Sequence, residues 1–192
     1  MKRCPGTTYE KPVLCLNSGG IDSLVLQAHI KAQGFIPYSL FIDYGQPARE
    51  REQAAAQKIA AFYGGKFYTE RVRLEIFKQP PFSSSAAHSP IFFSIAAAYC
   101  DTLNIPRMGL GWKQKRKGLK IMTPLLEKTK LNIARLGAKY AAPFELSWSC
   151  QGAGSAPCGE CPKCTKRNSV LERIARGSGA AGPRAAGSRS GS

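Results

Sequence analysis

The chain has 192 residues, of which 43% are hydrophobic, and its 28 lysines and arginines against 12 acidic residues give a formal net charge of +16. This length and composition are typical of one globular domain with a sizeable core. No apolar run approaches the ~20 residues of a transmembrane helix, and the first residues lack the apolar stretch of a signal peptide, so we expect a cytoplasmic protein. The positive charge favours anionic ligands, including nucleotides, nucleic acids and acidic small molecules.

After a lead-in over residues 1–11, the chain is expected to form a strand, a glycine-rich turn and a helix. Residues 13–16 are a short apolar run, residues 24–32 have helical spacing, and Ser18-Gly19-Gly20-Ile21-Asp22-Ser23 lies between them. Glycines let the backbone approach a ligand closely, and the helix directs its free N–H groups and positive dipole end at the turn. This pattern predicts a phosphate-binding loop. The alternative is an ordinary turn in which Asp22 or Ser23 caps the helix.

Strands and helices then alternate as far as residue 145. The expected strands cover residues 38–42, 66–70 and 107–111, and the expected helices cover residues 48–63, 89–103 and 128–141. Two more stretches are predicted to be extended, over 123–126 and 144–149, and a last helix is predicted over 165–176. The alternation favours an α/β fold, a doubly wound parallel sheet in a single domain over residues 1–176. Residues 177–192 contain mainly Gly, Ala, Ser, Pro and Arg and are predicted to be a disordered tail.

The positions of the strands also predict where a ligand binds. Ligands of such sheets lie at the carboxyl ends of the strands. We therefore expect the phosphate-binding loop and Asp43-Tyr44-Gly45-Gln46 to lie on one edge of the sheet.

A basic segment over residues 112–120 has two interpretations. It contains no acidic residue, and its cations are Lys113, Lys115, Arg116, Lys117 and Lys120. One interpretation is a solvated loop. The other is a loop that faces an anion, such as a substrate, a phosphate or an RNA backbone.

Four of the seven cysteines are clustered near the end of the chain. They are Cys150, Cys158, Cys161 and Cys164. Four thiolates at this close spacing predict a closed, tetrahedral, structural zinc site in the loop 150–164. An iron–sulfur cluster or free core thiols are the alternatives. Cys15 and Cys100 lie in apolar stretches and are expected in the core.

Together these motifs resemble one family. The six-residue loop, Asp43-Tyr44-Gly45-Gln46, and Ser147-Trp148-Ser149 followed by the four cysteines are similar to the 7-cyano-7-deazaguanine synthases of queuosine biosynthesis. These belong to the PP-loop ATP-pyrophosphatase superfamily, which has an adenine nucleotide alpha hydrolase-like fold. The resemblance implies a cytoplasmic, homodimeric ligase that uses ATP, Mg²⁺ and Zn²⁺ and does not bind a membrane. Nucleic acid is a possible partner but not an expected one.

The reaction that the resemblance implies begins with adenylation of the carboxylate of 7-carboxy-7-deazaguanine. Ammonia then gives the amide, and a second ATP gives the nitrile, with release of AMP and pyrophosphate. The residues that this carries over to the phosphates are Ser18, Gly19, Gly20, Ile21, Asp22 and Ser23. Asp43 and Tyr44 would flank the adenine, and Asp22, Ser23 and Lys130 would serve catalysis. A solvated helix lysine is the alternative for Lys130.

The chain also departs from the family pattern. Pro47 and Ala48 stand where a basic residue and a histidine are usual, and residues 86–89, which include His88, replace Pro-Gly-Arg-Asn. The short basic segment replaces a longer, acidic, substrate-recognising insert. The alternatives are therefore a related enzyme that adenylates a tRNA base or a protein target, one that stops at the amide, and a non-catalytic zinc-bearing binding module.

Overall fold

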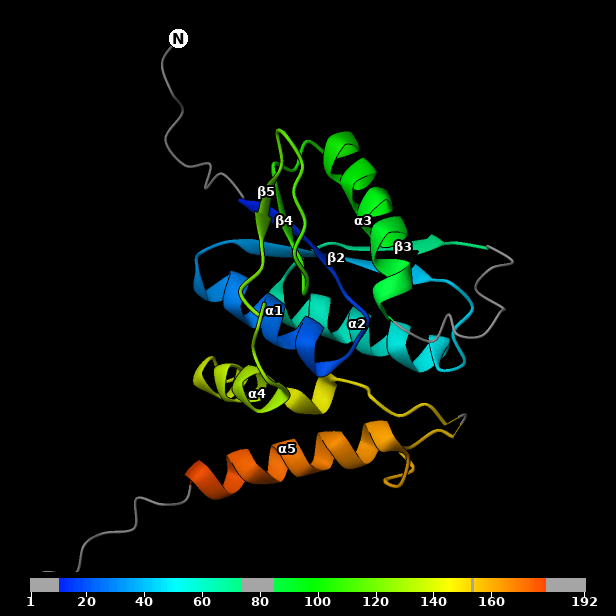
Figure 1. The fold of residues 1–192 in the computed structure, drawn as a ribbon, viewed down its shortest axis with the longest axis vertical. Coiled ribbons are helices and arrows are strands. Elements are labelled where there is room, and N and C mark those ends of the chain that lie inside the picture. Colours follow the sequence, from blue (N-terminus) through cyan, green and yellow to red (C-terminus); the bar gives the residue numbers. More distant parts are fainter. Residues whose placement is uncertain (1–10, 74–84, 153, 179–192) are drawn as a thin grey trace, which may run out of the picture.

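The computed structural model describes residues 11–73, 85–152 and 154–178. Its centre is a five-stranded parallel sheet in the order β3-β2-β1-β4-β5 (Figure 1). The strands are β1 (Pro12–Leu16), β2 (Ile36–Asp43), β3 (Phe67–Arg71), β4 (Arg107–Gly109) and β5 (Lys120–Met122). The predicted parallel sheet is confirmed.

Helices cover both faces of this sheet. They are α1 (Ile21–Ala32), α2 (Arg49–Tyr63), α3 (Ser85–Thr102), α4 (Lys130–Lys139) and α5 (Pro162–Ser178), with a short 3-10 helix η2 (Phe144–Leu146). In Figure 1, α1 and α2 lie on one face, α3 lies on the other, and α4 and α5 are stacked outside α1. The arrangement is the predicted doubly wound one.

The central strand β1 shows why its sequence is apolar throughout. Leu14 packs with the α3 side of the sheet, together with Ala96 and Met108. Val13 and Cys15 point to the opposite face and pack with α1. A strand buried on both faces has no polar alternation, so it appears as a continuous apolar run.

Helix α3 begins earlier than predicted. The sequence predicts its start at Ser89, with Pro90 in the first turn, but the helix starts at Ser85 and contains Pro90. Proline removes one backbone N–H donor and usually favours a helix start. Here the following apolar stretch, including Ala96 and Cys100, is buried against the sheet, and this packing holds the helix around the proline.

Two other predictions of extended backbone are wrong. The last strand is β5, which begins at the last residue of the basic segment, whereas residues 123–126 form a turn closed by the bond from Leu126 N to Thr123 O at 3.1 Å. Residues 144–146 are the 3-10 helix η2 rather than extended chain. Since β5 is a three-residue edge strand that is only partly buried, its apolar pattern is too short to predict it.

The C-terminal helix α5 starts at Pro162 rather than at Thr165 and includes Gly177 and Ser178, which were predicted to belong to the tail. Proline is favoured in the first helical turn, where its missing N–H has no partner to lose. Residues 1–10 of the predicted lead-in and the rest of the tail, 179–192, lie outside the described residues. Within the described residues, no helix combines the length and the apolar character needed to cross a membrane.

Candidate functional site

The glycine-rich loop joins the carboxyl end of β1 to the start of α1. Gly19 has φ +75°, and a Cβ atom added there would lie 2.4 Å from the backbone oxygen of Glu52. The left-handed φ is unfavourable for other residues, and the close approach leaves no room for a side chain. Position 19 therefore requires glycine for two independent reasons.

Helix α1 presents its N-terminus to this loop without a side-chain cap. Its N-cap residue is Gly20, so neither Asp22 nor Ser23 caps the helix. The Ser18 N–H instead donates to Ser23 Oγ at 3.1 Å, and the two serine hydroxyls are also 3.1 Å apart. The first-turn N–H groups of a helix have no partner within it. This end of α1 therefore has the geometry of an anion-binding site.

Asp22 and Lys130 meet beside the loop. Lys130 Nζ donates to Asp22 Oδ2, which joins the start of α4 to the start of α1. The other carboxylate oxygen, Asp22 Oδ1, is buried and has no hydrogen-bond partner among the described residues. An unpaired, anionic oxygen at a phosphate-type loop is a suitable ligand for a hard cation such as Mg²⁺.

The Asn17 side chain holds the loop through hydrogen bonds, a role that the sequence did not predict. Its side-chain oxygen accepts from the Gly19 N–H at 3.0 Å, and its amide nitrogen donates to Ser39 Oγ and to Ala56 O. Ser39 Oγ in turn donates to Gln27 Oε1 at 3.1 Å. A polar residue directly after a buried strand is the signal that was available in the sequence. These bonds fix the loop to both β2 and α2.

Asp43, at the carboxyl end of β2, is surrounded by cations. Its carboxylate is 2% exposed and lies 3.1 Å from Arg71, 3.3 Å from Arg73 and 3.7 Å from Arg49. Burial opposes the charged form and by itself would raise the pKa of Asp43. Hydrogen bonds from Arg73, the Gly45 N–H and Arg71 outweigh it and hold the pKa below its ordinary value. The carboxylate is thus committed to fixing the 43–46 turn.

The 43–46 turn lies on the same sheet edge as the loop and is connected to it through Glu52. Gln46 Nε2 donates to Glu52 Oε2 at 3.1 Å, and the backbone oxygen of Glu52 faces Gly19. The ring of Tyr44 packs 5.4 Å from that of Phe92. Burial, with a smaller contribution from the charge of Glu52, raises the pKa of the Tyr44 hydroxyl, so it stays neutral.

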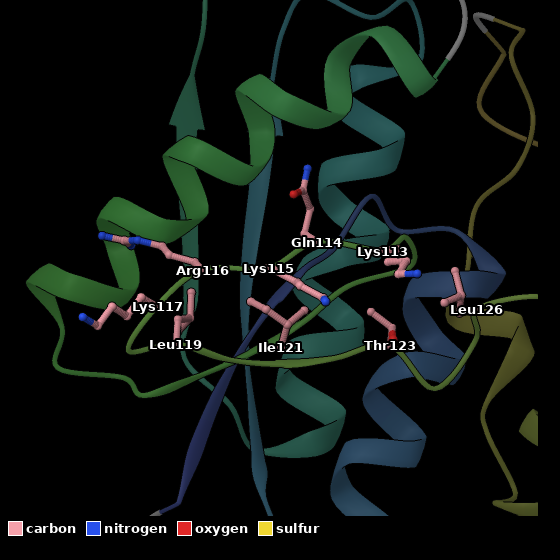
Figure 2. Close-up of a pocket in the computed structure, with 9 residues that line it drawn as sticks. All are labelled: Lys113, Gln114, Lys115, Arg116, Lys117, Leu119, Ile121, Thr123 and Leu126. Carbon is pink, nitrogen blue, oxygen red and sulfur yellow. The ribbon is translucent and has the colours of Figure 1, made fainter.

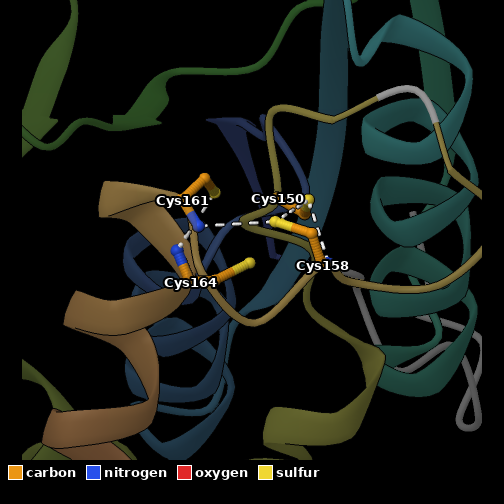
Figure 3. Close-up of side chains that lie close together, drawn as sticks. All are labelled: Cys150, Cys158, Cys161 and Cys164. Atoms are coloured by element: carbon orange, nitrogen blue, oxygen red, sulfur yellow. Dashed lines mark hydrogen bonds between the residues drawn. The ribbon is translucent and has the colours of Figure 1, made fainter.

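The four clustered cysteines converge on one point (Figure 3). The sulfurs of Cys150, Cys158, Cys161 and Cys164 all lie within 4.8 Å of one another, and those of Cys150 and Cys158 are 3.5 Å apart. A tetrahedral Zn–S₄ site with bonds of ~2.3 Å needs sulfurs about 3.8 Å apart. The donor set and its spacing therefore fit a zinc ion.

Backbone N–H groups also point at these sulfurs. Cys150 Sγ accepts from the N–H groups of Gly152 and Cys158, at 3.3 and 3.4 Å. Hydrogen bonds to the backbone N–H groups of Gln151 and Cys164 lower the pKa of Cys161 to about 6. Such bonds favour the thiolate, which is the form that binds metal.

The cysteine segment touches the glycine-rich loop directly. The Trp148 N–H donates to Gly19 O at 2.8 Å, and the Trp148 indole N–H donates to Cys150 O at 2.8 Å. On the other side, Arg167 of α5 donates to Phe144 O at 2.8 Å. The sequence predicted the metal cluster and the loop separately, but it did not predict this contact between them.

Two of the positions at which the chain departs from the family pattern lie in a helix or directly before one. Ala48 is buried and is the N-cap residue of α2, so it has a place in packing. The backbone of His88 lies in α3, but its side chain is outside the described residues, as are residues 74–84.

Known proteins resemble this chain in sequence. The sequence model described as "Queuosine biosynthesis protein QueC" matches residues 97–175. The 7-cyano-7-deazaguanine synthase of Thermosynechococcus vestitus is 31% identical over 219 aligned positions, which cover 87% of this chain and 93% of that protein. The chain belongs to the 7-cyano-7-deazaguanine synthase family.

Another member of the family is similar to this chain, and one solved structure shares its fold. The 7-cyano-7-deazaguanine synthase of Picrophilus torridus is 28% identical, over 80% of this chain and 84% of that protein. The solved NMN synthetase of Francisella tularensis shares the fold, with a TM-score of 0.54 at 16% identity, over 93% of this chain and 91% of that one. The chain is thus a member of an enzyme family built on the PP-loop fold.

Proposed function

We propose that this chain is an ATP-dependent ligase that converts 7-carboxy-7-deazaguanine, with ammonia, into 7-cyano-7-deazaguanine. Membership of the 7-cyano-7-deazaguanine synthase family supports this reaction. The observation that carries the proposal is the geometry of residues 18–23, where a left-handed glycine, two paired hydroxyls and an uncapped helix N-terminus meet. That arrangement suits the polyphosphate of ATP.

The reaction needs ATP because a carboxylate is a poor electrophile. Its oxygen attacks the α-phosphorus of ATP, the bond to the β-phosphate breaks, and an acyl adenylate and pyrophosphate form. Ammonia attacks the carbonyl carbon, AMP leaves, and the nitrogen loses a proton to give the amide. The amide oxygen then attacks the α-phosphorus of a second ATP, pyrophosphate leaves, and loss of AMP and of both protons of the amide nitrogen gives the nitrile.

The chain's own residues are assigned roles in the adenylation steps. The N–H groups at the start of α1 and the hydroxyls of Ser18 and Ser23 would hold the departing pyrophosphate and stabilise the charge that develops on it. Lys130 would add a positive charge at the same place, positioned by its bond to Asp22. Asp43 and Tyr44 would border the adenine from the neighbouring strand, with Asp43 acting through the turn that it fixes.

Two metal ions have different roles in this proposal. Mg²⁺ would neutralise charge on the phosphates, and Asp22 Oδ1, which has no hydrogen-bond partner among the described residues, would bind it. Zn²⁺ would be held by Cys150, Cys158, Cys161 and Cys164 and would be structural, because all four positions are filled by the protein.

The proposal is tested by incubating the purified protein with ATP, Mg²⁺, ammonium and 7-carboxy-7-deazaguanine, and following AMP and the deazaguanine species by mass spectrometry. AMP with nitrile is the expected result, and Lys130→Met, which removes the ammonium but keeps the length of the side chain, should reduce it strongly. AMP with the amide as the end product would replace the nitrile synthase by an amide-forming enzyme. Absence of AMP would reject the small-molecule substrate.

A further inference from the structure

A groove lined by the basic segment lies on the α3 side of the sheet (Figure 2). Its volume is about 640 Å³, and it is lined by Lys113, Gln114, Lys115, Arg116, Lys117, Leu119, Ile121, Thr123 and Leu126. The groove exists because β4 and β5 are parallel and are joined by a non-helical crossover. The crossover, residues 110–119, must return from the carboxyl end of β4 to the start of β5.

The lining of the groove is strongly cationic. It contains four basic side chains and no acidic one. Lys113, Lys115 and Lys117 are exposed, and within the part of the chain that the structure describes none of them forms an ion pair. Three uncompensated ammonium groups on one short segment make this a site for a ligand with several negative charges.

The segment that carries these lysines is held in place. Arg116 donates to Ala97 O at 3.1 Å and pairs with Asp101 at 2.6 Å, which ties the crossover to α3. Trp112 and Leu119 pack against the core on either side of the lysines. Cations on a fixed segment lose less conformational freedom when a ligand binds than cations on a mobile one.

Apolar side chains form the rest of the groove. Leu119, Ile121 and Leu126 are only partly buried and line the hollow between the lysines and the end of β5. The carboxylates of an acidic peptide would contact the lysines but would leave this apolar surface exposed to water. A single-stranded nucleic acid presents both phosphates for the cations and flat, unstacked bases for an apolar surface.

We propose that this groove binds a stretch of single-stranded nucleic acid, with its phosphates on Lys113, Lys115 and Lys117 and a base against the apolar floor. The juxtaposition of three unpaired lysines with an apolar hollow on a fixed crossover carries this inference. One end of the groove, at Thr123 and Leu126, belongs to the turn that leads to Lys130 and hence to Asp22. A bound single strand of nucleic acid would therefore run toward the glycine-rich loop.

The inference is tested by fluorescence anisotropy of labelled RNA and DNA oligonucleotides of about 12 nucleotides, without ATP, over a series of salt concentrations. The triple variant Lys113→Gln, Lys115→Gln, Lys117→Gln removes three phosphate contacts. The slope of log K against log salt should then fall by about 2, since each contact on a single strand contributes roughly 0.7. Comparison of the RNA and DNA arms shows which sugar is preferred.

A matched control removes the same charge elsewhere. Arg51, Lys58 and Lys139 are exposed, on α2 and α4, so Arg51→Gln, Lys58→Gln, Lys139→Gln lowers the net charge equally and should leave the slope unchanged. Both variants keep Arg116, and their melting temperatures should equal that of the parent. Equal weakening by the two triple variants, or no binding by the parent, would overturn the inference.

Two competitors separate the remaining possibilities. Polyglutamate that displaces the oligonucleotide at equal charge would overturn the assignment in favour of an acidic protein partner. Duplex that binds as tightly as single strand would overturn the placement of a base in the hollow. Because the experiment measures binding without ATP or 7-carboxy-7-deazaguanine, its result is independent of the proposed reaction.

Discussion

At Gly19, a left-handed φ coincides with the close approach of another stretch of backbone, a combination found at no other glycine among the described residues. Its φ of +75° alone costs a non-glycine residue about 1–2 kcal/mol. The 2.4 Å approach to Glu52 O adds a steric clash with backbone, which cannot be relieved by moving a flexible side chain. The loop shape that suits an anion therefore depends on the absence of a side chain at this position.

We predict that Gly19→Ala lowers the affinity for ATP by at least about tenfold, because the loop must shift away from Glu52. Isothermal titration calorimetry with Mg–ATP measures the loss. The matched control is Gly64→Ala, since Gly64 has φ +72° with no atom within 4 Å of the added Cβ. Gly64→Ala should lower stability by a similar strain but keep ATP affinity. Equal affinities in the two variants would contradict the importance of the close approach.

The lowered pKa of Asp43 predicts how the free energy of unfolding depends on pH. Its pKa is below the ordinary value in the folded state, because the hydrogen bonds from Arg73, Gly45 and Arg71 exceed the opposing effect of burial. A carboxyl with a lowered folded pKa stabilises the protein above its unfolded pKa of about 3.9, and this contribution is lost as the pH falls through the folded value. Asp43→Asn should cost about 2–3 kcal/mol at pH 7.

The difference between the same variant and the parent should shrink as the pH falls below about 3.9, because the unfolded parent then binds a proton and the stabilisation by the charged form decreases. Urea unfolding at pH 7 and at pH 2.5 measures the two differences. Glu50→Gln is the control, because the Glu50 side chain is 83% exposed and, among the described residues, forms an ion pair with Arg49 alone. A destabilisation by Asp43→Asn that is equal at both pH values would show that the ion pairs contribute nothing.

At the scale of elements, the cysteine segment and the glycine-rich loop form one unit through the bond from Trp148 N to Gly19 O. The same segment is joined to α5 through Cys161 and Cys164, which stand beside and within the first turn of that helix. A metal ion bound by the four sulfurs would therefore hold the segment around Trp148 in place, and Trp148 in turn holds the glycine-rich loop.

We predict that removal of zinc from the holoprotein lowers ATP affinity by about tenfold, within the usual range of coupling between two sites. Metal content by atomic emission and ATP binding by equilibrium dialysis are measured on the same samples before and after chelation. Cys158→Ala should reproduce the loss, whereas Cys100→Ala, which changes a buried cysteine outside the cluster, should retain the metal. Unchanged ATP affinity in metal-free protein would show that the glycine-rich loop keeps its shape without the metal-bound cysteine segment.

Elements with a long, regular pattern were predictable from the sequence, and short or locally ambiguous ones were not. Glycines predict the ends of α1 and α2, and an apolar run predicts β1. These predicted boundaries lie within two residues of the observed ones. β5 was missed because three partly buried residues carry no periodicity, and α3 was begun late because Pro90 suggests a helix start. The environment of Asp43 was unpredictable, because its arginines lie on other elements.

For the whole molecule, the resemblance to the family also implies a homodimer, which stays a prediction. Multi-angle light scattering after size exclusion should give twice the mass of one chain at micromolar concentration. Phe62, a large apolar side chain that is 57% exposed on α2, is a contact to test, and Phe62→Ser should shift the equilibrium toward monomer if the dimer uses this face. A single-chain mass for the parent protein at all concentrations would contradict the dimer.

The bond between Trp148 and Gly19 also has a consequence for synthesis on the ribosome. The two residues stand near opposite ends of the described chain, so the glycine-rich loop emerges early while the residue that holds it emerges late. Chains fold progressively as they emerge, and contacts between distant residues form last. A nascent chain interrupted before Trp148 would contain every residue of the loop and still lack its finished shape. Competence to hold a nucleotide would thus be acquired only after Trp148 has emerged from the ribosome.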